Sequence, residues 1–169
     1  LGGFILPFGQ ALGYDIPVFD FRLPGVTSIS ADTHKYGYGL KGTSVVLYRD
    51  LSFRRYQYYV APSWKGGIYV SNGLAGSRSG GLIAATWAAM VRYGREGYMR
   101  YAKQIFETAF RMQAAVKDAG LVIMGDPTFC FSFRSDDFDI YHVNDFMKTR
   151  GWRFNGQQHP SAIHMCVTR

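Results

Sequence analysis

The chain has 169 residues, of which 47% are hydrophobic and 17% aromatic, a composition typical of a folded globular protein and not of a disordered one. Its formal net charge of +7 favours anionic ligands such as phosphates, lipid head groups or nucleic acid, without choosing among them. No run approaches the roughly 18 apolar residues of a membrane span, and no signal peptide is recognisable. Leu1 in place of an initiator methionine, and an apolar stretch that stops at Arg169, predict a segment of a longer polypeptide.

The first half of the chain alternates short apolar runs with helical patterns. Glycine-flanked residues Phe4–Leu12 predict a short helix, and Leu51–Gly67, aromatic and basic without a clear period, predicts a loop with some helix. Gly80–Tyr93 is small and apolar on most faces and predicts a buried helix. Runs rich in β-branched or aromatic residues, bounded by Gly, Pro and Asp, predict three strands at Val18–Phe21, Ser28–Ser30 and Ser44–Tyr48.

The second half begins with the clearest amphipathic helix, Glu96–Ala119, in which apolar residues recur every three or four positions until Gly120 ends the pattern. The pattern that follows predicts neighbouring strands at Leu121–Met124 and Phe129–Arg134, a helix at His142–Arg150, a strand start at Gly151–Phe154 and a strand at Ile163–Val167. This order predicts a second, smaller α+β unit, with the boundary near Gly94.

The chemistry is predicted to lie where the strand at Ser28–Ser30 ends. Lys35 follows that strand and precedes a glycine-containing turn, the position at which α/β sheets bind ligands. A lysine there forms a Schiff base with a carbonyl compound if its amine is partly deprotonated, and a neighbouring cation such as Lys41 or protonated His34 would favour that. Spacing alone leaves open the alternative of a solvated lysine in a basic loop.

The wider pattern resembles a known family. Ser30, followed after three residues by His34-Lys35-Tyr36-Gly37, resembles the cofactor-lysine segment of fold-type I pyridoxal-phosphate enzymes, which include the glutamate and aromatic amino-acid decarboxylases. Stretches spread over essentially the whole chain, in the same order, are similar to the sphingosine-1-phosphate lyase family: Val18–Phe21, Val26–Gly37, Gly66–Tyr69, Ala75–Gly81 and Asp137–Tyr141.

This resemblance implies a fold. The expected class is α/β, of the fold-type I or aspartate aminotransferase-like kind. Residues 1–94 would form the C-terminal half of the cofactor-binding large domain. Residues 95–169 would form the linking helix and part of a small α+β C-terminal domain.

The resemblance also implies a cofactor and roles for particular residues. Pyridoxal 5′-phosphate would be held by Lys35 through a Schiff base, with His34 beside it on the cofactor phosphate. Lys41 matches the family lysine that binds the substrate phosphate. Gly76 and Ser77 precede a helix, where free backbone N–H groups attract anions, and in the family the equivalent serine reaches the cofactor of the neighbouring subunit. A homodimer with a shared active site is therefore expected.

The implied reaction is cleavage of a carbon–carbon bond in a phosphorylated long-chain base, sphingosine 1-phosphate, to a long-chain aldehyde and phosphoethanolamine. The pyridinium-binding aspartate, the ring-stacking residue and the base for the substrate hydroxyl are expected outside these residues, so the segment by itself should be inactive. The expected location is the cytoplasm or, in a eukaryote, the cytosolic face of the endoplasmic reticulum, with any membrane attachment coming from an upstream segment.

Other patterns favour structural roles. Arginines and Lys65 interleave with aromatic residues between Tyr48 and Lys65, as in surfaces that bind single-stranded nucleic acid, but no nucleic-acid module accompanies them and a dimer contact or active-site rim is favoured. Three histidines lack zinc-site spacing relative to the two scattered cysteines, so we predict no metal and free thiols; these residues are His142, His159, His164, Cys130 and Cys166.

Two other functions stay open on the sequence. One is a pyridoxal-phosphate decarboxylase of the same fold, which has no substrate phosphate for Lys41 to bind. The other is a non-enzymatic basic binding protein derived from this fold.

Overall fold

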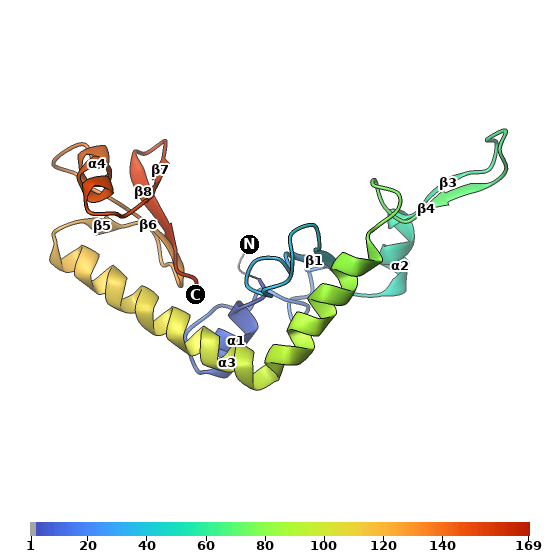
Figure 1. The fold of residues 1–169 in the computed structure, drawn as a ribbon, viewed down its shortest axis with the longest axis horizontal. Coiled ribbons are helices and arrows are strands. Elements are labelled where there is room, and N and C mark those ends of the chain that lie inside the picture. Colours follow the sequence, from blue (N-terminus) through green and yellow to red (C-terminus); the bar gives the residue numbers. More distant parts are fainter. Residues whose placement is uncertain (1–2) are drawn as a thin grey trace. The chain divides into compact units, whose positions relative to one another are not determined.

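The computed structural model describes residues 3–169 (Figure 1). The chain divides into two compact units, one comprising the residues up to Pro7 together with Pro17–Gly94, and the other comprising Phe8–Ile16 and Arg95–Arg169. Helix α3 (Gly80–Asp118) contributes to both units. At Gly94 its backbone leaves the helical conformation, with φ of 56° and ψ of −177°. Glycine adopts a positive φ without the steric cost that a side chain adds.

The first unit is built on two short antiparallel ribbons. Strand β1 pairs with β2 so that Ser28 lies opposite Tyr48, and β3 pairs with β4 so that Tyr59 lies opposite Ser71. Asp50 caps the helical turn between the ribbons by accepting a hydrogen bond from the Ser52 amide at 2.8 Å. The elements are β1 (Ser28–Ala31), β2 (Val45–Tyr48), α2 (Leu51–Arg54), the 3₁₀ turn η1 (Arg55–Gln57), β3 (Tyr59–Ala61) and β4 (Tyr69–Ser71).

The second unit contains an antiparallel sheet with the strand order β5-β6-β8-β7. Side chains alternate between its faces, so that Phe131 and Phe133 of β6 are buried on one face. The elements are β5 (Val122–Ile123), β6 (Cys130–Arg134), α4 (Tyr141–Thr149), β7 (Asn155–Gln157) and β8 (Ala162–Cys166), together with most of α1 (Leu6–Ala11).

Phe106 of α3 forms the centre of the core in this unit. Its ring is fully buried, stacks on Tyr14 at a centroid distance of 4.9 Å and meets Phe129 edge-on at 5.7 Å. A Cβ at Gly9 would lie 2.6 Å from the Phe106 ring, so only glycine allows α1 to pack this closely. These contacts explain why Phe8–Ile16 belongs to the second unit, which the sequence pattern did not predict.

Most predicted elements are confirmed. Helices are present at α1, α3 and α4, and strands at β1, β2, β5, β6 and β8. Gly120 follows the end of α3 with φ of 79°, as expected of a helix terminator. The strand predicted to start at Gly151 begins later, at Asn155. Among residues 3–169, none of the helices combines the length and the apolar character needed to cross a bilayer.

Three predictions about the first unit are wrong. Val18–Phe21 is not a strand, because Asp20 accepts hydrogen bonds from the amide and guanidinium of Arg22 and closes a turn. Leu51–Gly67 contains strand β3 besides its helical turns. The helix at Gly80–Tyr93 is present but not buried: Trp87 is 67% exposed and Val91 60%, because nothing within residues 3–169 covers those faces.

Candidate active site

Lys35 lies in a tight loop at the carboxyl end of β1. The Lys35 amide donates to the Asp32 carbonyl at 3.3 Å, and the Gly39 amide donates to the Thr33 carbonyl at 2.9 Å. A Cβ at Gly37 would stand 2.5 Å from that same Thr33 carbonyl oxygen, which as backbone cannot move aside cheaply. Gly37, which the sequence places in a flexible turn, is therefore required for the close approach of the loop to the Thr33 backbone.

Asp32 is the ionic partner of Lys35. The Lys35 Nζ lies 2.6 Å from Asp32 Oδ2, and the two side chains are 36% and 31% exposed. The hydrogen bond from Lys35 is the main cause that lowers the pKa of Asp32 below its usual range. The carboxylate therefore stays ionised at neutral pH, and the stability it contributes is lost only as the pH falls through that lowered pKa. The amine is thus oriented by a neighbouring side chain while remaining accessible.

His34 is held by the far side of the same loop. Its Nδ1 lies 2.7 Å from the Thr43 carbonyl oxygen. A carbonyl only accepts, so Nδ1 carries the proton, and in the neutral ring Nε2 is the acceptor. The contact fixes both the orientation and the tautomer of the imidazole next to Lys35.

Three threonine hydroxyls join the loop to α3. Thr43 Oγ1 lies 2.8 Å from Thr33 Oγ1 and 2.9 Å from Thr86 Oγ1, and it donates to the Leu40 carbonyl at 3.2 Å. The single proton of Thr43 is used on Leu40, so Thr33 and Thr86 both donate to Thr43. Thr33 and Thr86 are buried. Sequence reasoning missed this cluster because its members are far apart in the chain and carry no motif.

A small polar cavity of about 170 Å³ lies where α3 begins, lined by Gly42, Thr43, Ser44, Arg78, Ser79 and Ile83. The Ser79 hydroxyl accepts a long hydrogen bond, 3.4 Å, from the Leu82 amide and so caps the start of α3. A guanidinium, hydroxyls and the positive end of a helix meet here, a combination that favours an anion.

The other predicted site residues are exposed. Lys41 projects from the turn directly before the cavity, with the exposed Gly42 after it at φ of 101°. Gly76 and Ser77 lie in an exposed loop preceding α3, and among residues 3–169 the ion pair of Lys35 is with Asp32 and not with this loop. The structure therefore brings His34, Asp32 and Lys35 together and leaves Lys41, Gly76 and Ser77 accessible.

The basic and aromatic segment after β2 mainly contacts itself. Arg49 donates through Nε to the Val26 carbonyl at 2.8 Å and also contacts the Leu23 carbonyl, so it clamps the loop before β1. Arg54 and Arg55 lie over the rings of neighbouring tyrosines at 5.7 and 4.8 Å. Arg54 and Arg55 thus contact their own segment, whereas Arg49 contacts the loop before β1.

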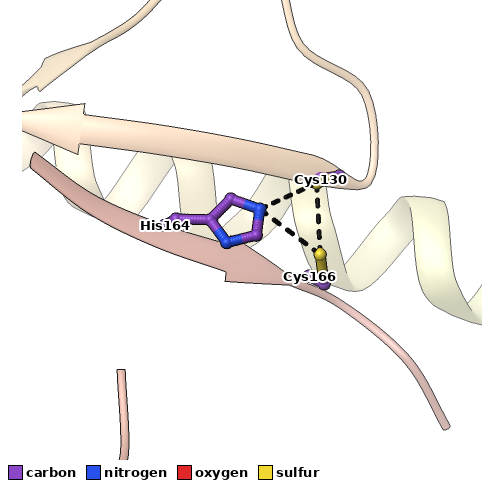
Figure 2. A group of neighbouring side chains, drawn as sticks. All are labelled: Cys130, His164 and Cys166. Atoms are coloured by element: carbon purple, nitrogen blue, oxygen red, sulfur yellow. Dashed lines mark hydrogen bonds between the residues drawn. The ribbon is translucent and has the colours of Figure 1, made fainter. Parts of the chain in front are cut away.

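A second cluster, in the other unit, joins Cys130, His164 and Cys166 (Figure 2). The two sulfur atoms lie 3.2 Å apart as free thiols, and His164 Nε2 lies 3.1 Å from Cys130 and 3.4 Å from Cys166. Burial first, and then the Cys166 thiol, raise the pKa of Cys130 to about 12, so in the absence of a cation it is protonated. The prediction that the two cysteines are scattered is wrong in space, because antiparallel pairing of β6 with β8 places them opposite each other.

Comparison with known proteins agrees with the predicted resemblance. The solved structure of a sphingosine-1-phosphate lyase from Burkholderia pseudomallei K96243 matches with a TM-score of 0.95 and 70% sequence identity, covering 99% of this chain and 39% of that one. The curated sphingosine-1-phosphate lyase of Dictyostelium discoideum is 52% identical over 170 residues, covering 99% of this chain and 32% of the relative. No family profile matches.

The chain belongs to the sphingosine-1-phosphate lyase family. It spans about a third of the length of the curated lyases it matches. A glutamate decarboxylase from Lactobacillus brevis, 22% identical, matches with a TM-score of 0.74 over 99% of this chain and 40% of that one, which shows the shared fold alone. The predicted fold-type I class is therefore confirmed for this segment of a lyase-family protein.

The threonine cluster generates a prediction about stability. Thr86→Val keeps the shape of the side chain but removes the hydroxyl, leaving Thr43 with one donor fewer. In the full-length lyase-family protein this should lower the free energy of unfolding by about 1–3 kcal/mol, measured by urea denaturation. Thr86→Ser, which keeps the hydroxyl, is the matched control. A loss confined to Thr86→Ser, with Thr86→Val as stable as the wild-type protein, would assign the effect to methyl packing and not to the hydrogen bond.

Proposed function

We propose that the full-length protein containing this chain is a pyridoxal-phosphate-dependent lyase that cleaves sphingosine 1-phosphate or a related phosphorylated long-chain base. The products are a long-chain aldehyde and phosphoethanolamine, formed by breaking the bond between the amine-bearing and the hydroxyl-bearing carbons. The observation that carries the proposal is the Asp32-oriented Lys35 amine at the end of β1, in a chain 70% identical to a solved lyase of this name.

The residues present fit an aldehyde cofactor. Lys35 offers a primary amine that is about a third exposed, and Asp32 holds it at the mouth of the loop. The His34 Nδ1 is already hydrogen-bonded to the Thr43 carbonyl, so Nε2 is the ring nitrogen that would contact a ligand. Lys35 and His34 would hold pyridoxal 5′-phosphate, whose ring supplies the electron-accepting capacity for carbon–carbon cleavage when bound.

The substrate phosphate is assigned to Lys41. Lys41 is exposed and immediately precedes Gly42, which lines the small polar cavity together with Arg78. An ammonium and a guanidinium beside a phosphate dianion give charge-assisted contacts. A decarboxylase of the same fold has no such phosphate to bind, and the 22% identity to a glutamate decarboxylase supports no shared substrate.

A homodimer with a shared site is supported by the exposed loop and ribbon. Ser77 and Gly76 are exposed, as expected of groups that serve a neighbouring subunit. The β3–β4 ribbon carries large apolar side chains that are at least 40% exposed, an apolar surface suited to burial against another chain: Tyr58, Tyr59, Val60, Trp64, Ile68, Tyr69 and Val70.

The cofactor assignment is tested by trapping. Borohydride reduction of the full-length protein with bound pyridoxal phosphate, followed by peptide mapping, should place the label on Lys35, because its amine is accessible and oriented by Asp32. Lys35→Ala should lose the label, whereas Lys65→Ala, at an exposed lysine of the same unit, should keep it. Label on a different lysine in the wild-type protein would refute the assignment.

The substrate assignment is tested with Lys41→Ala. Loss of a charge-assisted contact to the phosphate should reduce kcat/KM on sphingosine 1-phosphate by roughly 30- to 1000-fold while the visible cofactor absorbance is kept. Lys41→Arg retains the charge and should recover part of the loss. Unchanged cleavage would make Lys41 a surface lysine, and loss of the cofactor band would assign it to the cofactor.

The shared site is tested by complementation. Lys35→Ala and Ser77→Trp, each inactive in the full-length protein, should regain part of the activity after mixing and refolding, because a mixed dimer holds one site with neither substitution. Mixing Lys35→Ala with Lys35→Ala protein is the control. An active protein that sediments as a monomer would contradict the shared site.

A further inference from the structure

The Cys130–His164–Cys166 cluster is built on one face of the sheet in the second unit (Figure 2). Cys130 lies directly opposite Cys166, and His164 lies opposite Ser132, one diagonal step from Cys130. Successive side chains along a strand point to opposite faces of the sheet, so all three side chains lie on the face opposite to the one on which Phe131 and Ile163 are buried. The backbone ladder of β6 and β8 therefore presents two thiols and an imidazole together.

We propose that Cys130, Cys166 and His164 bind a borderline-soft transition-metal ion, with Zn²⁺ as the ion that this donor set suits best. All three donor atoms lie within 4.8 Å of one another. A tetrahedral Zn²⁺ with Zn–S near 2.3 Å and Zn–N near 2.0 Å sets its sulfurs about 3.8 Å apart and each sulfur about 3.5 Å from the nitrogen. The two sulfurs, 3.2 Å apart, need to separate by about 0.6 Å, and the sulfur–nitrogen separations of 3.1 and 3.4 Å need to open by about 0.4 and 0.1 Å.

The histidine is what favours a metal over a simple pair of thiols. A cross-strand disulfide would use the two sulfurs alone and leave the imidazole without a role. Here His164 turns Nε2 toward both sulfurs, at 3.1 and 3.4 Å, so the ring completes a triangle of ligand atoms. A divalent cation at its centre favours the thiolate forms, since its charge reverses the effect of burial on thiol ionisation.

The position of the cluster indicates what the ion does. Cys130 is the first residue of β6 and Cys166 the last of β8, so the ion would fasten one end of this strand pair. Three ligands from one sheet face leave the fourth coordination position pointing away from the sheet, open to water or a small thiol. The site uses none of the residues assigned to the lyase reaction.

The experiment uses the full-length protein, reduced with a phosphine, stripped of metal with a chelator and then titrated with Co²⁺. One tetrahedral, thiolate-bound Co²⁺ per chain should appear through its visible d–d bands, and Zn²⁺ should displace it because zinc binds such sites more tightly. This readout requires no substitution, so it does not depend on the folding of a variant. A reduced wild-type protein that retains neither ion would overturn the proposal. This holds even if air oxidation of the same protein forms a disulfide between Cys130 and Cys166.

Substitutions locate the site. Cys130→Ser, Cys166→Ser and His164→Gln should each weaken Zn²⁺ binding by more than the roughly 10- to 100-fold typical of losing an outer partner. His142→Gln, at an exposed histidine on α4, is the control and should keep one Zn²⁺ per chain. Equal zinc content and an equal cobalt spectrum in the wild-type protein and the double variant Cys130→Ser/Cys166→Ser would place the metal elsewhere and refute the assignment.

Discussion

The hydrogen bonds among Thr33, Thr43 and Thr86 are the constraint on which the Lys35 loop depends. Lys35 is separated from β2 by a turn rich in glycine, which has little conformational preference of its own. The Thr43 oxygen, accepting from Thr33 and Thr86 and donating to Leu40, ties both ends of that turn to α3. The rest of the site follows, because the Thr43 backbone carbonyl also fixes His34. One residue thus positions the loop through its side chain and the imidazole through its backbone.

Charge near this loop is unevenly distributed. Among the described residues, Asp32 is the carboxylate that pairs with Lys35, whereas Arg78 lines the cavity at the start of α3 and Lys41 immediately precedes Gly42 of that lining, and no ion pair holds either of them. Asp32 therefore offsets one cation and leaves the others to attract phosphate groups. The loop thus orients one amine through Asp32 while the charges of Lys41 and Arg78 stay unpaired, an arrangement that suits an anionic ligand.

The sequence predicts those parts of the molecule that local pattern determines. The helix at Glu96–Ala119 and the strands at β6 and β8 follow from periodicity, and the Lys35 loop from a motif with specific spacing. The apolar residues of Val18–Phe21 predict a strand, but hydrogen bonds from Arg22 to the Asp20 carboxylate close a turn there instead. The threonine and cysteine–histidine clusters could not be predicted, because each joins residues that are distant in the chain: Thr43 and Thr86 are 43 positions apart, and Cys130 and Cys166 are 36 apart. The pairing and packing that bring them together have no signature in the sequence.

The two units differ in how far they account for their own stability. The second unit buries a contiguous aromatic core around Phe106, closed by Gly9 and Tyr14. The first unit instead leaves strand β2 and one face of α3 open, with Val46 51% and Trp87 67% exposed. Apolar surface of that extent needs cover from other polypeptide, and the chain spans only about a third of its curated relatives. The Lys35 loop is anchored to that same stretch of α3 through Thr86, so polypeptide that covers the helix would also stabilise the loop. Activity therefore has to be measured in the full-length protein, whereas the geometry of the cysteine–histidine cluster depends on the β6–β8 ladder alone.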